Sequence, residues 1–249
     1  MTPLLRKPSL FLAAAVIALL PACAQAGAGG ASKSEIEKIV REYILENPEI
    51  VEEALIALSE KEKIAQAAAA QAAIDANASQ LYAHAGDYSI GPADAKVTVV
   101  EFFDYRCGYC KRSVDWVRAL PKEYDGEVRV VFKELPIFGG ISETAALAAL
   151  AAGRQGKYFE LHVALMNLKS NDDLTEASID TLAAAAGINV PKMRADMKSP
   201  GVARQLAEMK ALGEALAVTG TPGFFIGDQH IEGANIPAIE AAIRDALKS

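Results

Sequence analysis

The chain has 249 residues and a net charge of −7 at pH 7, so it is long enough for one large domain with appendages. Chains of this length bury a core without help from disulfides or metals, which excludes the small disulfide scaffolds. Apolar residues make up 51% and charged residues 23% of the chain, which excludes the collagen-like and disordered classes. The acidic balance offers no basic surface to nucleic acid, and we expect no nucleic-acid partner.

Residues 1–26 have the pattern of a secretory signal peptide. A basic region with Arg6 and Lys7 precedes a short apolar stretch, and a small-residue cleavage pattern follows at 24–26. A membrane-spanning helix needs about 20 apolar residues, roughly twice the length available here. We therefore predict export to the periplasm, an oxidising compartment in which cysteine pairs form disulfides. A minor alternative is a lipoprotein signal that leaves Cys23 lipidated at the membrane surface.

A Gly-rich flexible link over 27–33 leads into a helical segment that we expect over 34–83. Ser34 and Glu37 have the spacing of a capping box, which predicts the start of a first helix. The pair Asn47-Pro48 then restarts the chain, with the asparagine as cap of a second, longer helix.

An apolar stripe of Val51, Leu55 and Leu58 runs along this second helix. Such a stripe must pack on something. One interpretation is a helix folded back on its own domain, and the other is an oligomerisation stalk. The pattern alone does not decide between them, because heptads are few and the following Ala-rich positions are weak.

The residue pattern changes from helical to strand-like at about residue 96. A β-branched and aromatic run over 97–103 has the length of a buried strand and leads directly into Cys107-Gly108-Tyr109-Cys110. A helix over 111–120 and a second strand over 128–132 follow. This strand-helix-strand context favours a redox-active role for a CxxC motif.

The remainder of the chain completes the same domain. Residues from about 142 to 218 contain several helices and no convincing strand, with Ser142 and Thr175 as candidate N-caps. Two short strands and a helix follow from Gly223 to the C-terminus. We therefore expect an α/β domain whose sheet is assembled from both ends and interrupted by a helical insertion.

The two cysteines of the motif carry the expected chemistry. Thiol-disulfide exchange needs an attacking thiolate and a second thiol that resolves the mixed disulfide. At a helix start the first sulfur lies over free N–H groups, which lowers its pKa, so Cys107 is predicted as nucleophile and Cys110 as resolving thiol. The alternatives are a permanent disulfide and half of a zinc site. Zinc would need two further ligands, yet no second CxxC exists and the histidines share no ligand spacing: His84, His162 and His230. His162 lies in an apolar stretch and is expected to be a core or rim residue, not a catalyst.

The chain resembles the DsbA-like thioredoxin-fold family. Three stretches carry this resemblance: 101–110 (EFFDYRCGYC), 133–136 (KELP) and 219–225 (TGTPGFF). It covers residues 88–249 and implies a thioredoxin fold with a helical insertion over about 142–218.

The family assigns roles to four further residues. It implies that Pro222 is cis and lies against the active-site cysteines, with the backbone of Thr221 offered to a bound peptide. Glu101 and Lys133 match family positions where a buried acid and a lysine lie beneath the cysteines. Such a charge pair could exchange a proton with the buried thiol, and a simple buried salt bridge is the equal alternative.

The dipeptide between the cysteines narrows the expected role. Gly108 and Tyr109 add no positive charge, so the disulfide should be less oxidising than one beside a histidine. This dipeptide and the threonine before the proline are similar to periplasmic disulfide isomerases. With the helical segment at 34–83, the chain is most similar to the suppressor-of-copper-sensitivity group, ScsC. That similarity implies a homotrimer held by 34–83, isomerase or reductase activity, and Cu(I) affinity at the two sulfurs.

We therefore expect a periplasmic thiol-disulfide oxidoreductase, first of all a disulfide isomerase or reductase. The expected partners are disulfide-bonded or misfolded protein clients and a membrane redox partner. No cofactor is expected beyond the redox-active disulfide Cys107–Cys110, and no resident metal. The alternatives are a monomeric DsbA-type dithiol oxidase and a Cu(I)-binding periplasmic chaperone that uses the same two cysteines.

Overall fold

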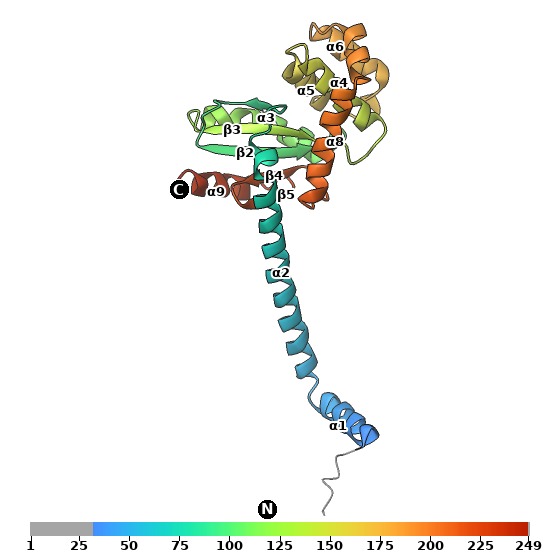
Figure 1. Cartoon of the computed structure of the whole chain (residues 1–249), viewed down its shortest axis with the longest axis vertical. Helices are drawn as coiled ribbons and strands as arrows, with labels where there is room; N and C mark the ends of the chain where they lie inside the picture. Colours follow the sequence, from blue (N-terminus) through green and yellow to red (C-terminus); the bar gives the residue numbers. More distant parts are fainter. Residues whose placement is uncertain (1–31, 249) are drawn as a thin grey trace, which may run out of the picture. The chain divides into compact units, whose positions relative to one another are not determined.

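The computed structural model describes residues 32–248 (Figure 1). The predicted signal peptide, Cys23 and most of the predicted link therefore lie outside the described residues. The chain divides into two compact units, one ending at Ser59 and one beginning at Glu60, and each is described by itself. Two N-terminal helices precede the sheet, α1 (Lys33–Glu46) and α2 (Glu49–Tyr82), and α2 crosses the division between the units.

Helix α1 begins two residues ahead of the predicted capping box. Ser32, not Ser34, is the N-cap, because Ser32 is the last residue in an extended conformation. Its hydroxyl accepts a hydrogen bond from the Glu35 N–H, and the Glu35 carboxylate accepts one from the Ser32 N–H at 2.8 Å. Asn47 ends α1 instead of capping α2, since its backbone and side-chain N–H groups both donate to the Tyr43 carbonyl.

Residues 32–59, the described part of the first unit, bury none of their large apolar side chains. The predicted stripe residues Val51, Leu55 and Leu58 are 44%, 60% and 51% exposed. Other exposed apolar side chains of α1 and the first part of α2 are Ile36, Ile39, Val40, Tyr43, Ile44, Leu45, Ile56 and Ile64. Within residues 32–248 nothing covers this surface, which we call the stalk apolar surface.

The second unit is built on a five-stranded sheet with the order β1-β3-β2-β4-β5. Its strands are β1 (Tyr88–Ile90), β2 (Val97–Phe103), β3 (Val128–Glu134), β4 (Gly223–Ile226) and β5 (Gln229–Glu232). Strands β2 and β3 are parallel and the other neighbours are antiparallel. The sheet is thus assembled from both ends of the domain. Strand β1 was not predicted, because three half-buried residues give no periodic signal.

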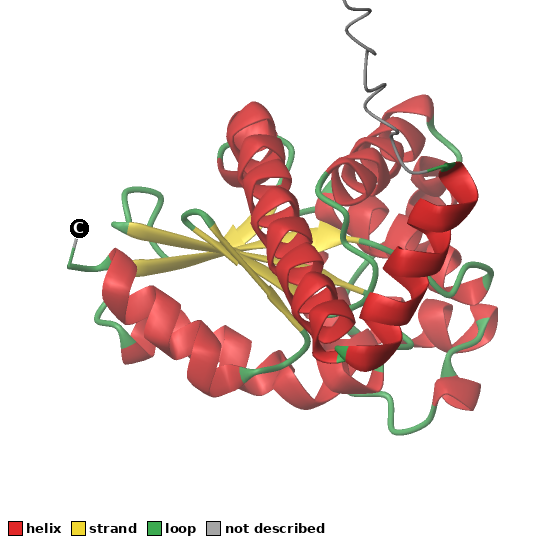
Figure 2. Cartoon of the chain, turned by 90° about the horizontal axis from the view of Figure 1, so that it is seen from below, coloured by secondary structure: helices red, strands yellow, loops and turns green. Residues whose placement is uncertain are grey.

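Helices cover both faces of the sheet (Figure 2). The helices that follow α2 are α3 (Gly108–Glu123), α4 (Ile141–Gly153), α5 (Tyr158–Met166), α6 (Glu176–Ala185), α7 (Val190–Met197), α8 (Pro200–Ala215) and α9 (Ile236–Ala246), with a 3-10 turn at Asn171–Asp173. Alternate residues of a strand point to opposite faces. Val99 and Phe103 therefore join one core cluster with residues of α3 and α9, and Val100 and Phe102 join another with residues of α8.

The last turns of α2 are part of the second unit. Ile74 and Leu81 are buried in the core cluster on the α8 face, and the Tyr82 hydroxyl donates to the Gly227 carbonyl at 2.6 Å. This unit therefore begins ahead of the expected start at residue 88, since it recruits the end of α2 to cover its sheet.

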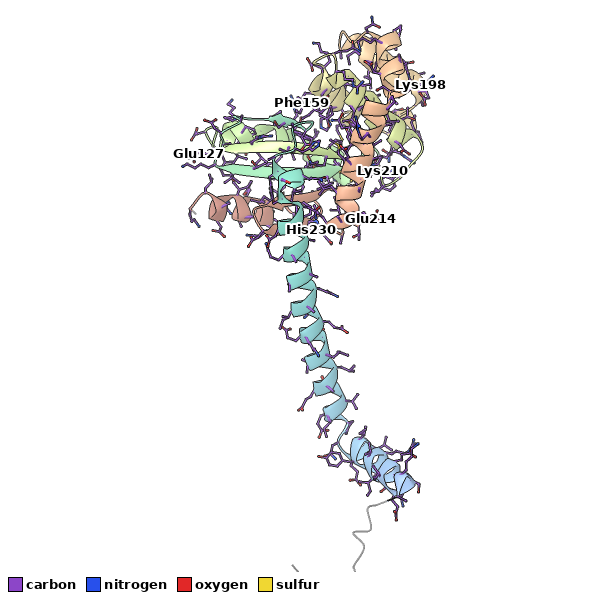
Figure 3. The ribbon with its side chains drawn as sticks, in the orientation of Figure 1. Glu127, Phe159, Lys198, Lys210, Glu214 and His230 are labelled. Atoms are coloured by element: carbon purple, nitrogen blue, oxygen red, sulfur yellow. The ribbon has the colours of Figure 1, made fainter. Side chains whose placement is uncertain are left out.

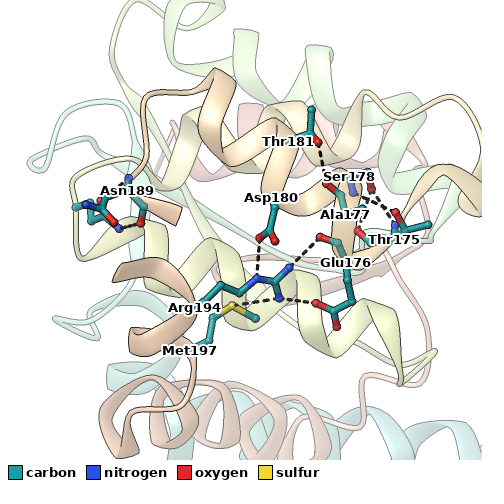
Figure 4. A network of polar contacts seen from close by, with 10 residues as sticks. Thr175, Glu176, Ala177, Ser178, Asp180, Thr181, Asn189, Arg194 and Met197 are labelled. Atoms are coloured by element: carbon teal, nitrogen blue, oxygen red, sulfur yellow. Dashed lines mark hydrogen bonds and ion pairs between the residues drawn. The ribbon is translucent and has the colours of Figure 1, made fainter. Parts of the chain in front are cut away.

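The insertion forms a layer of short helices beside the sheet (Figure 1). Thr175 caps α6 as predicted. Arg194 ties α7 to α6, donating to Asp180 at 2.7 Å and to the backbone and carboxylate of Glu176 (Figure 4). Among the described residues, none of the helices combines the length and apolar character that a membrane span requires.

The prediction that Ser142 is a helix N-cap was wrong. The N-cap of α4 is Gly140, whose φ of 53° suits glycine. Ser142 lies inside the helix and is buried, and its hydroxyl donates to the Asp104 carboxylate at 2.7 Å. It therefore links α4 to the turn that precedes Cys107.

Candidate active site

Cys107 is the N-cap of α3. The chain leaves β2 at Phe103 and passes through a turn over 104–106, and α3 then begins at Gly108, three residues earlier than predicted. The Cys107 sulfur accepts a hydrogen bond from the Cys110 N–H at 3.3 Å. The free N–H groups of a helix start are thus directed at this sulfur.

The two thiols differ in their readiness to ionise. Both are free and buried, with exposed fractions of 4% for Cys107 and 1% for Cys110. The Cys110 thiol and the N–H groups of Cys110 and Tyr109 donate to the Cys107 sulfur and lower its pKa to about 6. Burial raises the pKa of the Cys110 thiol. At neutral pH the site therefore holds a thiolate at Cys107 and a protonated thiol behind it.

Thr221 and Pro222 form the wall opposite the sulfur. Their peptide bond is cis, as the family resemblance implied, and Pro222 is buried. The Thr221 carbonyl lies 3.1 Å from the Cys107 sulfur and accepts a hydrogen bond from it while the thiol is protonated. Ionisation of Cys107 removes that donor and leaves the Thr221 carbonyl open to another hydrogen-bond donor.

The dipeptide between the cysteines faces solvent. Gly108 is exposed and the Tyr109 side chain is 61% exposed. The Arg112 guanidinium lies 4.3 Å from the centre of the Tyr109 ring, in cation-π geometry. Arg112 was missed because its position one turn along α3 becomes visible only when the helix start is known.

Glu101 lies on the cysteine face of the sheet and is 3% exposed. Burial, and secondarily the neighbouring charge of Cys107, raise the pKa of this carboxyl to about 8. The charge of Glu101 in turn helps to raise the pKa of Cys110. The Glu101 carboxyl therefore interacts electrostatically with both cysteines.

Lys133 does not lie beneath the cysteines, and this part of the prediction was wrong. Its amino group donates to Asp87 at 2.5 Å and to the Gln80 carbonyl at 2.6 Å. Glu101 is paired in register with Phe132, so the next residue of β3 points to the opposite face. The hydrogen bond to Gln80 joins the sheet to the end of α2, and the ion pair with Asp87 joins it to the segment between α2 and β1.

Two other buried carboxyls shape the site, and the sequence analysis missed both. Asp104 accepts hydrogen bonds from the N–H groups of Arg106 and Phe138 at 2.7 and 3.1 Å, besides the bond from Ser142. Asp104 therefore fastens the turn before Cys107 to the loop that follows β3. Its place three residues before the motif is the only sequence signal for this role.

Glu134 is the last residue of β3 and points to the cysteine side of the sheet, as its register partner Phe103 does. One of its carboxyl oxygens accepts from the hydroxyls of Tyr105 and Tyr158 at 2.8 and 2.9 Å. Burial raises the pKa of Glu134. His162 packs against this cluster in the core, 1% exposed, with its Nδ1 3.2 Å from the Tyr105 hydroxyl. Burial lowers the pKa of His162 to about 3, so it is neutral.

No three His, Cys, Asp or Glu side chains among residues 32–248 gather in a metal-binding arrangement. Cys107 and Cys110 remain a two-sulfur site whose softness suits Cu(I). What the arrangement does chemically is thiol-disulfide exchange, because it pairs an activated thiolate with a resolving thiol.

Residues 83–245 match a family described as thioredoxin, and residues 33–65 match the N-terminal domain of the copper resistance protein ScsC. The chain belongs to the ScsC-like thioredoxin family. The second match falls on α1 and the first part of α2, the same residues that carry the stalk apolar surface.

Curated relatives of this ScsC-like chain include a Na⁺/H⁺ antiporter, NhaA 3 of Salinispora tropica. The two are 34% identical over 166 residues, which is 66% of this chain and 25% of the antiporter. The chain therefore spans about a quarter of the length of the curated relatives it matches.

Solved structures match over most of their length. Proteus mirabilis ScsC in a transitional conformation is 30% identical, with a TM-score of 0.64 over 86% of this chain and 96% of that one. The thiol-disulfide exchange protein alpha-DsbA2 of Wolbachia pipientis is 26% identical, with a TM-score of 0.66 over 73% and 97%. The geometry of the dithiol and the likeness to these structures both favour thiol-disulfide exchange at this site.

Proposed function

We propose that this protein is a periplasmic thiol-disulfide oxidoreductase that acts on protein disulfides as an isomerase or reductase. The observation that carries the proposal is the Cys107 sulfur at the start of α3, with a pKa of about 6, facing the Thr221 carbonyl. The leader pattern supports the periplasmic location.

The proposed reaction begins with the Cys107 thiolate. It attacks one sulfur of a client disulfide, an S–S bond forms between Cys107 and that sulfur, and the other client sulfur leaves as a thiolate that takes a proton from solvent. The freed client thiolate can then attack a second disulfide of the client, and the thiolate displaced there attacks the client sulfur of the mixed disulfide, which forms a new client disulfide and releases Cys107 as a thiolate. This route is isomerisation and consumes no electrons.

Reduction takes a second route. Cys110 loses its proton to ionised Glu101 and attacks the Cys107 sulfur, and the client sulfur leaves as a thiolate. Two electrons pass to the client, and the Cys107–Cys110 disulfide forms. A membrane redox partner that supplies two electrons then restores the dithiol.

The stalk apolar surface supports the isomerase role over an oxidase role. We propose that copies of the chain associate through this surface into a homotrimer. Linked catalytic units raise the local concentration of sites around one misfolded client, and association also limits access by the oxidant that would keep the dithiol paired. A monomer would favour the DsbA-type oxidase alternative.

Copper handling is the second candidate, favoured by the match of residues 33–65 to a copper resistance protein. Cu(I) would bind the same two thiolates, so metal and disulfide chemistry would compete. Thr221→Val keeps both sulfurs and alters the wall. We expect it to change client turnover much more than Cu(I) affinity, and loss of Cu(I) binding alone would contradict the enzyme assignment.

The test of the proposal is refolding of scrambled, disulfide-mismatched ribonuclease by the reduced mature protein. The expected result is recovery of RNA hydrolysis with the wild type and none with Cys107→Ser. Failure of the wild type to refold scrambled ribonuclease, together with efficient oxidation of reduced ribonuclease by the disulfide form, would replace isomerase with oxidase.

A further inference from the structure

A groove of about 840 Å³ opens on the catalytic unit between α4 and α8. Leu147 of α4, and Ala207 and Ala211 of α8, form two of its walls. The loop after β3, with Leu135 and Ile137, forms a third. The proposed reaction does not use this groove.

The groove continues to the dithiol through two segments. The first is the loop after β3, which Asp104 holds against the turn before Cys107 through the Phe138 N–H. The Arg106 guanidinium lies 5.8 Å from the centre of the Phe138 ring, on the same junction. The second is the run that leads to the cis peptide, because Thr219 lines both the groove and a smaller hollow of about 260 Å³. Tyr109 and Thr221 line that hollow, so it adjoins the dithiol.

The lining favours an apolar occupant. Its interior is formed by alanine, leucine, isoleucine and valine side chains, and charge is confined to three residues, Glu143, Lys210 and Glu214. Glu143 and Lys210 neutralise each other in an ion pair of 3.3 Å between α4 and α8. Figure 3 labels Lys210 and Glu214 along α8. Between groove and dithiol, Phe138 is 53% exposed and extends the apolar surface.

We propose that this groove binds the polypeptide that flanks the client cysteine, as a loosened or unfolded segment with apolar side chains. The inference rests on the proposed function and names its substrate class. The client sulfur is held at Cys107 beside Thr221, and the chain that carries it leads past Thr219 and Phe138 into the groove. Apolar segments are exposed in misfolded proteins and buried in native ones, so the groove selects clients whose disulfides need rearrangement.

Continuity with the dithiol argues for this occupant. A second groove of about 750 Å³, lined among others by Phe159, Leu182 and Ala185, is as large and as apolar, but it shares no lining residue with the hollow at Tyr109 and Thr221. It provides a matched control, because Ala185 and Ala207 are both exposed alanines on helices that line a groove.

The experiment compares Ala207→Trp and Ala185→Trp in the full mature protein. The probes are two symmetric peptide disulfides, identical except that leucines flank the cysteine in one and serines in the other, and glutathione disulfide. Each reaction converts the Cys107–Cys110 dithiol to its disulfide and releases two thiols, and the second-order rate constant of this single turnover is measured for each probe.

The wild type should reduce the leucine peptide about tenfold faster than the serine peptide, the factor that about 1.4 kcal/mol of apolar contact represents. Ala207→Trp should abolish this preference and leave the serine peptide and glutathione disulfide unchanged, whereas Ala185→Trp should keep it. Circular dichroism and thermal unfolding verify the fold, and Ala211→Trp replaces Ala207→Trp if that variant unfolds.

Three results would overturn the inference. The leucine preference could be absent in the wild type, could survive in Ala207→Trp and Ala211→Trp, or could be lost in Ala185→Trp. A changed sedimentation coefficient of Ala207→Trp with an unchanged leucine preference would assign the groove to a contact between copies of the chain. If the groove does not bind client polypeptide, both peptides are reduced at equal rates. If the proposed function is wrong, neither peptide is reduced.

Discussion

Glu101 and Lys133 lie one register position apart on adjacent parallel strands, yet their side chains point to opposite faces of the sheet. Glu101 faces the cysteines, and Lys133 faces the end of α2 and pairs with Asp87. Both side chains are almost fully buried. In the proposed reaction Glu101 therefore acts on the chemistry of the cysteines, whereas Lys133 stabilises the fold.

Lys133→Met should therefore destabilise the protein without changing its chemistry. It leaves the buried Asp87 carboxylate without its cation, which costs about 3–5 kcal/mol. Urea denaturation measures the loss, and the double variant Lys133→Met with Asp87→Leu should recover part of it, because no unpaired charge remains. A shift in the pH profile of Cys107 alkylation in Lys133→Met would contradict the separation.

Glu101→Gln should do the reverse. The carboxyl has a pKa of about 8 in the folded protein and an ordinary value of 4.5, so the folded state binds more protons between these values. The stability of the wild type should therefore fall as pH rises from about 4.5 to 8 on account of this group. Glu101→Gln lacks this loss and should be more stable than the wild type at pH 8, as urea denaturation at several pH values would measure.

The same variant should slow release of client from the mixed disulfide. In the wild type the rate of release should rise through pH 8 as Glu101 ionises and accepts the proton of Cys110. Stopped-flow measurements should find a slower step without this rise in Glu101→Gln. An unchanged pH profile would remove Glu101 from the proposed reaction.

Alkylation of Cys107 by iodoacetamide should rise with pH through a midpoint of about 6 and then level off, since the thiolate is the reactive form. Cys110 should stay unreactive at neutral pH. Cys110→Ala removes the thiol whose hydrogen bond contributes most to the lowered pKa, and should move the midpoint upward. Faster alkylation of Cys110 than of Cys107 would reverse their roles.

The principal helices and strands and the dithiol could be predicted from the sequence alone, because strand runs, helix caps and the CxxC spacing are local patterns. The cis peptide before Pro222 came from the resemblance, since Thr221-Pro222-Gly223 is otherwise a plain turn. The face of the sheet to which Lys133 points depends on the register between β2 and β3, and the sequence of a single strand does not reveal that register. The groove and the end of the stalk could not be predicted from the sequence either, because each depends on contacts between segments that are distant in the chain. One example is the packing of Leu81 against the sheet.

Leu55→Asp together with Leu58→Asp should convert the mature protein from an oligomer to a folded monomer, because buried charges at a subunit contact are costly. Isomerase activity should be lost and dithiol reductase activity kept. Sedimentation velocity measures the mass, and Glu53→Gln with Glu60→Gln on the same helix is the control that should stay oligomeric. A monomeric wild type at micromolar concentration would refute the stalk proposal.

Deletions define where the stalk ends. Removing residues 27–59 should leave a folded monomer, because the compact catalytic unit begins at Glu60. Removing residues 27–83 should instead destabilise that unit, because Ile74 and Leu81 leave its core. Equal thermal stability of the two deletions would contradict the assignment of the end of α2 to the catalytic unit.

The central claim is that Cys107 is the sulfur that attacks client disulfides and Cys110 the one that resolves them. Intact mass spectrometry of the covalent adducts formed with scrambled ribonuclease tests this most directly, with Cys110→Ser and Cys107→Ser compared under identical conditions. The account predicts that Cys110→Ser accumulates a mixed disulfide joined through Cys107 and that Cys107→Ser accumulates none. Equal trapping by both variants, or trapping by Cys107→Ser alone, would contradict it.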